Sequence, residues 1–320
     1  MTDKEKYKQL CETEGSNIPL FLQYWWMNTV CKGKQWEVVL AYDKDGEQIV
    51  GAWPFLVGTK FGFRYILQPQ LTQYSGPWIR QCKYTNERSR NNWEMKVMEM
   101  LLDRMQQYKV AYFEQCMSPA ITNWMPLYWR GYSQTTRYTY RFEDLSDSEA
   151  IFKEFDQTKR RATIKRCLKS AHMVTGLCVK DFASLHHRYW SSKGEKDITP
   201  KDLMIRVMNH AIKRGNGLLI GLENDEGMLL GVHFIVYDAN SAYFLLGALN
   251  PDIRAIGVSE SLVWEEIQYF KGKTQAYDFE GSMERGVEYF NRLFGAHPTP
   301  YFKITKCNSP LFGLLLKLKH

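Results

Sequence analysis

The alternation of apolar and polar positions divides the chain into two stretches that predict similar sets of strands. Residues 36–58 (WEVVLAYDKDGEQIVGAWPFLVG) predict two strands joined by an Asp-Gly turn, because apolar positions alternate on both sides of the turn residues. Residues 217–249 predict three strands joined by two turns in the same way. Each stretch is therefore expected to begin a sheet of its own.

The elements that follow each set of strands also occur twice. The first copy has a helix at 91–108, a strand at 110–117 and, after a short helix, a closing strand at 138–142. The second copy has the corresponding helix at 258–270 and strands at 276–283 and 301–304. This internal repeat, with a boundary near 144–147, predicts an α/β fold, which some classifiers would name α+β. We expect two domains, 1–145 and 146–320, each a mixed central sheet flanked by helices, with the active cleft in the second.

Composition and charge narrow the class of protein. The 320 residues include 42 Lys and Arg against 35 Asp and Glu, and the net charge of +7 favours anionic partners. The seven cysteines contain no C-x-x-C pair, which is typical of a cytosolic protein without a metal site. No stretch predicts a signal peptide or a membrane span, so we expect a cytoplasmic protein. The apolar segment 309–320 either packs as a final helix or rests on the inner face of a membrane.

The strand predicted at 276–283 carries carboxylates where a core strand would be apolar. Because side chains alternate along a strand, Asp278, Glu280 and Ser282 are expected to share one face, opposite Tyr277 and Phe279. Two carboxylates in a dry core would cost several kcal/mol. The pattern therefore favours a cleft in which Glu280 accepts a proton and Asp278 raises its pKa.

Structural alternatives compete with this catalytic interpretation. Glu280 would pair with Arg285 or Arg292 and fasten the following helix, and Ser282 would only cap that helix. Tyr289, in the same predicted helix, is a candidate for protonating the leaving group.

Two further segments indicate anion binding. The helix predicted at 152–172 carries seven Lys and Arg residues, which either form a solvated face or line a groove for the phosphates of a nucleotide, a tRNA or a lipid. Downstream, Arg254, Gly257 and Ser259 form an R-x-x-G-x-S loop before a helix. Small residues at a helix N-terminus let backbone N–H groups approach a pyrophosphate.

These motifs resemble those of two related groups of acyltransferases. The loop resembles the acyl-CoA pyrophosphate loop of the GNAT acetyltransferases, Q/R-x-x-G-x-G/A, from which Ser259 departs at the last position. The doubled domain and the T-x-R-R-x-x-I-K-R helix resemble the FemAB-type acyltransferases. So do the segments DFEGS, F-x-x-x-F-G-A and P-Y-F-K-I at 278–282, 290–296 and 300–304, and the segment 70–79, which resembles the part beside the acceptor cleft.

The resemblance implies two tandem GNAT-like domains, the first of them degenerate, and transfer of an acyl or aminoacyl group to an amine. The donor would be acyl-CoA or aminoacyl-tRNA, the acceptor a small molecule or a cell-envelope precursor, and no cofactor would be permanently bound. Backbone N–H groups of 244–248 would polarise the acyl carbonyl. The candidate residues are Glu280, Asp278, Ser282 and Tyr289 for catalysis, Arg254, Gly257, Val258 and Ser259 for the donor, and Tyr74, Arg160, Arg161 and Lys165 for the substrate. The alternative is a non-catalytic protein of the same fold that binds an anionic ligand or partner.

Overall fold

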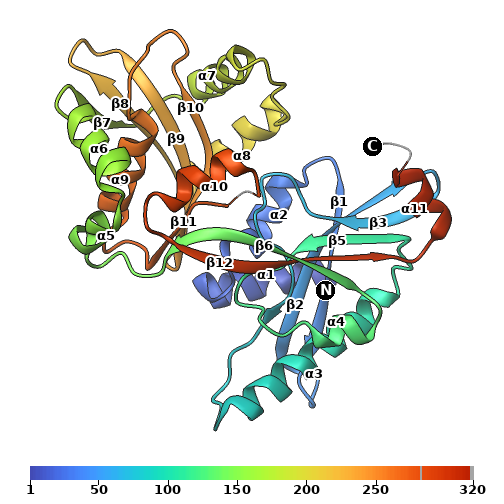
Figure 1. The fold of residues 1–320 in the computed structure, drawn as a ribbon. Coiled ribbons are helices and arrows are strands. Elements are labelled where there is room, and N and C mark those ends of the chain that lie inside the picture. Colours follow the sequence, from blue (N-terminus) through green and yellow to red (C-terminus); the bar gives the residue numbers. More distant parts are fainter. Residues whose placement is uncertain (282, 318–320) are drawn as a thin grey trace. The chain divides into compact units, whose positions relative to one another are not determined.

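The computed structural model describes residues 1–281 and 283–317, and the chain divides into two compact units (Figure 1). Unit 1 contains Met1–Arg137 and the chain from Pro300 onward. Unit 2 contains Tyr138–Thr299. Each unit has a mixed sheet flanked by helices, so the predicted α/β fold class is confirmed.

In unit 1 the strands follow the order β1-β2-β3-β5-β12, and β4 pairs with β2. The strands are β1 (Gln35–Tyr42), β2 (Ile49–Lys60), β3 (Phe63–Leu67), β4 (Trp78–Ile79), β5 (Tyr112–Cys116) and β12 (His297–Cys307). The helices are α1 (Asp3–Glu14), η1 (Gly15–Asn17), η2 (Leu20–Leu22), α2 (Tyr24–Val30), α3 (Glu87–Gln106), α4 (Met125–Trp129) and α11 (Pro310–Lys317). The predicted hairpin at 36–58 is thus confirmed as β1 and β2, with Trp36 opposite Leu56.

The core of unit 1 lies between its sheet and α3. Val97 and Leu101, one turn apart on α3, are fully buried together with Trp53 and Phe113 of the sheet. The indole N–H of Trp53 donates to the amide oxygen of Gln115 at 2.8 Å, which satisfies both polar groups inside this core.

In unit 2 the strands follow the order β6-β11-β10-β9-β8-β7. The strands are β6 (Ser133–Phe142), β7 (Ala171–Thr175), β8 (Gly217–Asn224), β9 (Leu229–Tyr237), β10 (Ser241–Leu249) and β11 (Ala276–Asp278). The helices are α5 (Ser148–Glu154), the π-helix η3 (Gln157–Arg161), α6 (Ala162–Cys167), α7 (Val179–Ser192), α8 (Lys201–Lys213), α9 (Val258–Phe270) and α10 (Arg285–Arg292). The predicted meander at 217–249 is confirmed as β8, β9 and β10.

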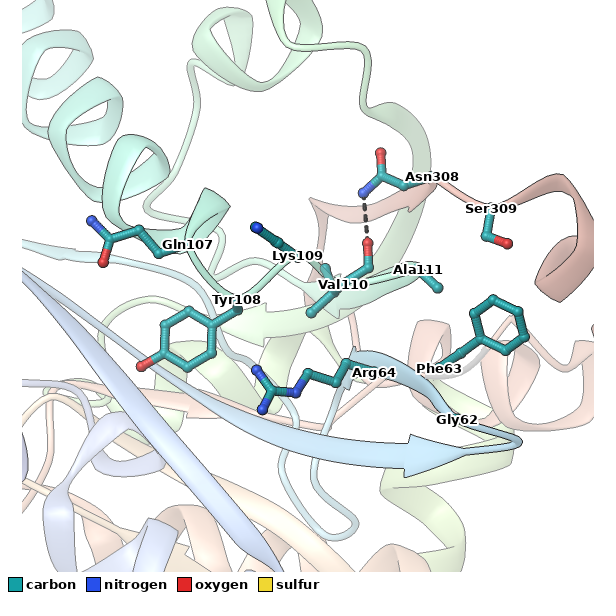
Figure 2. Close-up of a pocket in the computed structure, with 10 residues that line it drawn as sticks. All are labelled: Gly62, Phe63, Arg64, Gln107, Tyr108, Lys109, Val110, Ala111, Asn308 and Ser309. Carbon is teal, nitrogen blue, oxygen red and sulfur yellow. Dashed lines mark hydrogen bonds between the residues drawn. The ribbon is translucent and has the colours of Figure 1, made fainter.

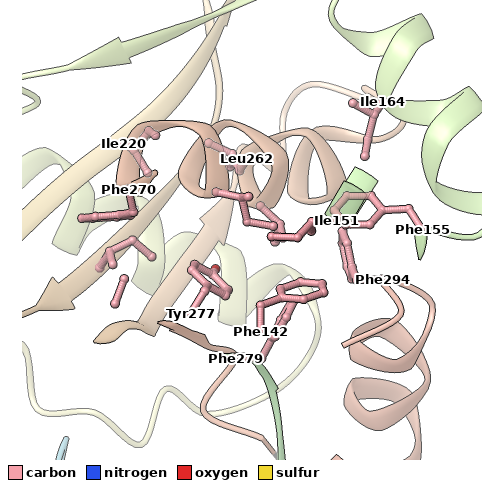
Figure 3. Packing of buried hydrophobic residues seen from close by; sticks show 14 of the residues in the cluster. Phe142, Ile151, Phe155, Ile164, Ile220, Leu262, Phe270, Tyr277, Phe279 and Phe294 are labelled. Atoms are coloured by element: carbon pink, nitrogen blue, oxygen red, sulfur yellow. The ribbon is translucent and has the colours of Figure 1, made fainter. Parts of the chain in front are cut away.

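Helix α9 covers one face of the sheet in unit 2, with α5 and α6 packed beside it, and α7 and α8 contact the sheet at β10 and β8 (Figure 1). Aromatic rings fill the space between α9, α10 and β11 (Figure 3). Phe155 and Phe294 meet edge to face at a centroid distance of 5.0 Å, and Phe279 lies 5.4 Å from Phe294. This aromatic core holds the residue after β11, Phe279, against Phe294, which follows the end of α10.

The closing strands of the two repeats are exchanged. Strand β6, which closes the first repeat, pairs with β11 through Tyr277 and Phe142. Strand β12, which closes the second repeat, pairs with β5 over Lys303–Cys307. The compact units therefore do not coincide with the ranges 1–145 and 146–320 expected from the repeat, because the repeat describes the order of elements and not the partners of its last strand.

The C-terminal segment packs on unit 1 through an aromatic side chain. Phe312 of α11 is 3% exposed, and its ring lies 5.5 Å from that of Phe63 and 6.3 Å from that of Tyr65. Leu311 and Leu314 are exposed. Among the described residues, none of the helices combines the length and the apolar character needed to cross a bilayer.

Candidate functional site

The candidate site lies in unit 2, where the pairing of β10 with β11 ends. The two strands pair in parallel from Ser241 to Tyr243 on β10, and β11 then ends at Asp278 while β10 continues to Leu249. The register of β10 against β9 shifts between Phe244 and Leu246, which marks a β-bulge. A bulge leaves its extra residue outside the ladder and bends the strand. This bulge lies within 244–248, the stretch at which the strand was expected to splay.

A pocket of about 420 Å³ opens at this point. It is lined by residues 244–249 of β10, His233 of β9, Tyr189 and Trp190 of α7, Ser259 of α9, Phe279, and residues 286, 287, 290 and 291 of α10. The lining is mostly apolar with a few polar groups, which is typical of sites for small molecules. Ser259 is the member of this set that the donor motif predicted.

The rest of the predicted donor loop lies beside this pocket. Arg254 and Val258 line a smaller pocket of about 220 Å³, and Tyr189 and Leu249 line both pockets. Arg254 is exposed, so its guanidinium is accessible to a ligand. A donor with phosphates at Arg254 would therefore have its acyl end close to the bulge of β10.

Gly257 shapes the start of α9. Its φ of 85° lies in the left-handed region, which is unfavourable for other residues. A Cβ at this position would lie 2.5 Å from Cγ2 of Thr163 and 3.2 Å from its carbonyl oxygen, so α6 approaches α9 closely only because residue 257 is glycine. No side chain caps α9 among the described residues, which leaves its first N–H groups for an anion.

Arg160 has a structural role that the sequence did not predict. It is 5% exposed, and its Nη1 donates to Glu260 while its Nη2 donates to the carbonyl of Phe290, both at 3.0 Å. Its guanidinium lies 4.8 Å from the ring centroid of Phe294. Arg160 therefore joins η3 to α9 and α10, and this position does not support the expectation that it contacts the substrate.

The other basic residues of this segment are placed differently. Lys159 is exposed and donates a short hydrogen bond to the hydroxyl of Tyr289. Arg161 is half-buried, and its Nε has no partner among the described residues. Lys165 is exposed near the ring of Phe152. Tyr289 is 41% exposed, and the pocket lining includes its neighbour Phe290 but not Tyr289 itself.

Asp278 does not face solvent. It is fully buried, and its carboxylate accepts hydrogen bonds from the hydroxyl of Thr139 at 2.6 Å, the backbone N–H of Glu280 at 2.8 Å and the guanidinium of Arg141 at 2.9 Å. The arginine that pairs with this segment is Arg141, and it pairs with Asp278, whereas the expected alternative was a pair of Glu280 with Arg285 or Arg292. The prediction that Asp278 lies open in a cleft is wrong, because β6 supplies the partners that make its burial possible.

The predicted alternation also fails beyond Asp278. Strand β11 ends there, and Glu280 has φ of 51°, so it does not continue the strand on which the shared face depended. The backbone N–H of Gly281 donates to the hydroxyl of Thr139 at 2.8 Å, which holds the turn. Ser282 lies outside the described residues.

The carboxyl group of Glu280 nevertheless has unusual surroundings. The side chain as a whole is partly exposed, but its Oε1 is enclosed and has no hydrogen-bond partner among the described residues. Burial raises the pKa of Glu280 well above its usual range, and the nearby Asp278 raises it further. The expected effect of Asp278 on the pKa of Glu280 is therefore confirmed in direction, although burial is the larger cause.

Tyr74, expected near the acceptor, lies in the interior of unit 1. It is 5% exposed, and its ring packs edge to face against Tyr301 at 5.3 Å and Phe21 at 6.3 Å. A packed aromatic core explains this position, and a contact with the acceptor stays a prediction.

Sequence reasoning missed two polar groups of the pocket and a third behind it. His233 and Asn291 line the pocket, and Glu266 of α9 is paired with His233 at 2.7 Å. One signal was present: His233 interrupts the apolar run of β9, and Glu266 occupies a position of α9 at which the helical spacing requires an apolar side chain. The same signal drew attention to Asp278.

Unit 1 contains a wider and more open pocket of about 610 Å³ between β3, the turn after α3, and the end of β12 (Figure 2). The side-chain amide of Asn308 donates to the carbonyl of Val110 at 2.9 Å across it. Its charged lining residues are Arg64 and Lys109, and none of its ten lining residues is an acid or a histidine. It offers no group for proton transfer near neutral pH.

Comparison with known proteins agrees with this architecture. Residues 158–291 match the sequence model of the acetyltransferase (GNAT) domain, the segment that contains the donor loop and the pocket. This part of the chain is therefore similar to a GNAT domain. No curated protein matches the sequence.

Solved structures show the same fold over almost the whole chain. FemX has a TM-score of 0.71 and 13% sequence identity, and the match covers 98% of both chains. The L-PGS protein from Bacillus licheniformis has a TM-score of 0.59 at 14% identity, covering 98% of this chain and 95% of that one. A tandem GNAT protein from the clavulanic acid biosynthesis pathway has a TM-score of 0.54 at 11% identity, covering 97% of each chain. At such identities the likeness establishes the fold alone.

Proposed function

We propose that the protein is an N-acyltransferase that moves an acyl or aminoacyl group from an activated donor to an amine. The donor would be acyl-CoA or aminoacyl-tRNA, and the acceptor a small molecule or a cell-envelope precursor. One observation carries the proposal: the bulged end of β10, the pocket beside it and the uncapped N-terminus of α9 lie together within unit 2.

Each part of this arrangement suits one part of the reaction. The N–H groups at the start of α9, with Arg254 beside them, would hold the phosphates of the donor. The parted strands β10 and β11 would let the acyl group enter the sheet, where backbone N–H groups at the bulge polarise its carbonyl. Glu280 remains a candidate base and Tyr289 a candidate acid, and their chain neighbours Phe279 and Phe290 line the pocket.

The exposed lysines of the basic segment support an extended anionic donor. Lys159, Lys165 and Lys169 are exposed on η3, α6 and the turn that follows. A tRNA would contact several of them and release counterions, so its affinity would fall steeply with salt. A CoA thioester, which carries fewer phosphates, would show a weaker salt dependence.

A panel of acyl-CoAs, CoA and aminoacylated tRNA tests the donor by thermal shift, because a ligand that binds the native state raises the melting temperature. Arg254→Ala should weaken a phosphorylated donor by about 1.5–3 kcal/mol through loss of a charged hydrogen bond. Lys180→Ala, which removes an exposed charge from α7, is the matched control. Binding without transfer to any amine would favour the non-catalytic alternative, and equal effects of both variants would refute the assignment of the donor loop.

A further inference from the structure

Three polar side chains form a buried chain that begins at the pocket. Nδ1 of His233 lies 2.7 Å from Oε1 of Glu266, and the hydroxyl of Tyr277 donates a short hydrogen bond to Oε2 of the same carboxylate. The three residues come from β9, α9 and β11, and their exposed fractions are 2%, 0% and 0%. His233 is the member of the chain that lines the pocket.

The hydrogen bonds define which ring nitrogen of His233 carries the proton. Burial raises the pKa of Tyr277 well above its usual range, and Glu266 raises it further, so the Tyr277 hydroxyl stays protonated and donates. Glu266 then accepts from both sides, which places a proton on Nδ1 of His233. Nε2 has no hydrogen-bond partner among the described residues, and its lone pair is available to a ligand in the pocket.

The imidazole ring of His233 is also held in place by the neighbouring strand, β10. It stacks on Phe244 with centroids 4.2 Å apart and an interplanar angle of 26°. Residue 247 is glycine, and a Cβ there would lie 2.9 Å from Cδ2 of His233 and 2.8 Å from Cζ of Phe244. Cδ2 is bonded to Nε2, so the missing side chain at 247 keeps this edge of the imidazole clear.

Few titratable or charged groups surround the imidazole of His233. From β8, the residue paired with His233 is Ile220, and from β10 the neighbours are Phe244 and Gly247, none of which titrates. Glu266 faces the ring from α9 with Tyr277 behind it, and Tyr189 of α7 lines the same pocket. The carboxylate of Glu266 is thus the charged group in direct contact with His233.

A second buried histidine in the same unit shows what a purely structural arrangement looks like. His186 pairs through Nδ1 with Asp197 at 2.9 Å, and its Nε2 lies 3.1 Å from the indole N–H of Trp190. Both of its nitrogens are occupied by protein groups, whereas one nitrogen of His233 is left for the pocket.

An independent observation also indicates a ligand at this place. Asn291 is 2% exposed and lines the pocket, and its Nδ2 is enclosed without a hydrogen-bond partner among the described residues. A buried donor without a partner destabilises the folded state unless a ligand accepts a hydrogen bond from it. The pocket therefore presents an unused donor at Asn291 and an unused acceptor at His233.

We propose that His233 is the catalytic base of the transferase, that Glu266 and Tyr277 position it, and that the nucleophilic amine lies in the pocket beside Nε2. The inference rests on the function proposed above and replaces Glu280 as the group that takes the proton. The lone pair of a neutral amine forms the bond to the acyl carbon, and its N–H proton moves to Nε2. The bond from the acyl carbon to the sulfur or oxygen of the donor breaks, the leaving atom takes the electron pair, and the imidazolium returns the proton to it.

Transfer kinetics between pH 5.5 and 9 for the wild type, His233→Gln, His233→Ala and Glu266→Gln test the inference. His233→Gln should lower kcat by about 10²- to 10⁴-fold with little change in the donor KM, and it should remove the acidic limb of the pH profile. Free imidazole should restore part of the rate of His233→Ala. Glu266→Gln should lower kcat about as much, since a side-chain amide can donate to Nδ1 and move the proton to Nε2. His172→Gln, which alters an exposed histidine of β7, should leave the profile unchanged.

The outcomes separate this inference from the proposed function. A folded His233→Gln variant with the wild-type rate and pH profile would overturn the inference alone. A wild-type protein that transfers nothing from any donor of the panel would refute the proposed function, and this inference with it. If His233→Gln does not fold, ¹⁵N spectra of the wild-type imidazoles decide the matter: an unprotonated Nε2 at His233 is expected, and a protonated one contradicts the proposal.

Discussion

Replacing Arg141 by methionine tests whether Asp278 is a structural residue. Asp278 is fully buried and the Arg141 side chain is 13% exposed, so the variant removes the positive charge of Arg141 from a buried carboxylate. Breaking such a pair costs about 3–5 kcal/mol. The hydroxyl of Thr139 and the N–H of Glu280 still donate to Asp278, at 2.6 and 2.8 Å, which favours the lower end of this range. We expect a loss of about 3 kcal/mol, or roughly 6–12 °C in the melting temperature of a unit of this size.

Arg188→Met provides the matched control. Its guanidinium pairs with Asp252 at the same distance of 2.9 Å, but the two side chains are 54% and 69% exposed. An exposed pair of this kind contributes at most about 1 kcal/mol. Urea unfolding measures both variants, and the midpoint should shift without a change in m. If Arg141→Met were as stable as Arg188→Met yet inactive, Asp278 would be a catalytic group and the structural assignment would be refuted.

Two further predictions concern Glu280 and Gly257. Because the folded state raises the pKa of Glu280, the folded protein binds more protons than the unfolded chain above pH 4.5, so this residue stabilises less as pH rises through its folded pKa. Glu280→Gln should therefore match the wild type in urea unfolding at low pH and exceed it at high pH, and a variant that is less stable at every pH would contradict this. Gly257→Ala should lower stability by about 1–3 kcal/mol and weaken donor binding, because the left-handed φ and the contact with Thr163 both oppose a Cβ. Gly272 has a φ of 72° and open space around it, so Gly272→Ala measures the cost of the left-handed backbone alone. Equal losses of stability in the two variants would show that the contact with Thr163 does not oppose a Cβ at residue 257.

The sequence was sufficient for features that depend on neighbours along the chain. The strands at 36–58 and 217–249 follow from alternation, and the loop before α9 follows from Arg254, Gly257 and Ser259 in a fixed order. Such features need no information about which distant segments meet.

Features that depend on distant partners were not predictable in this way. The burial of Asp278 requires Thr139 and Arg141, which belong to β6, and the exchange of closing strands that brings β6 beside β11 leaves no local mark in the sequence. The chain formed by His233, Glu266 and Tyr277 spans three elements in the same manner. A polar residue inside an apolar pattern shows that a partner must exist, but only the fold identifies that partner.

Glu280 combines three unfavourable features that local packing alone does not explain. A non-glycine residue at φ of 51° costs on the order of 1 kcal/mol, and its enclosed Oε1 lacks a partner among the described residues. Burial also raises the pKa of its carboxyl group, so Glu280 keeps its proton to a higher pH than an exposed glutamate does. His233, in contrast, has its Nδ1 bound to Glu266 and offers the lone pair of Nε2. The raised pKa therefore argues against Glu280 as the base, which agrees with the proposal that His233 takes the proton.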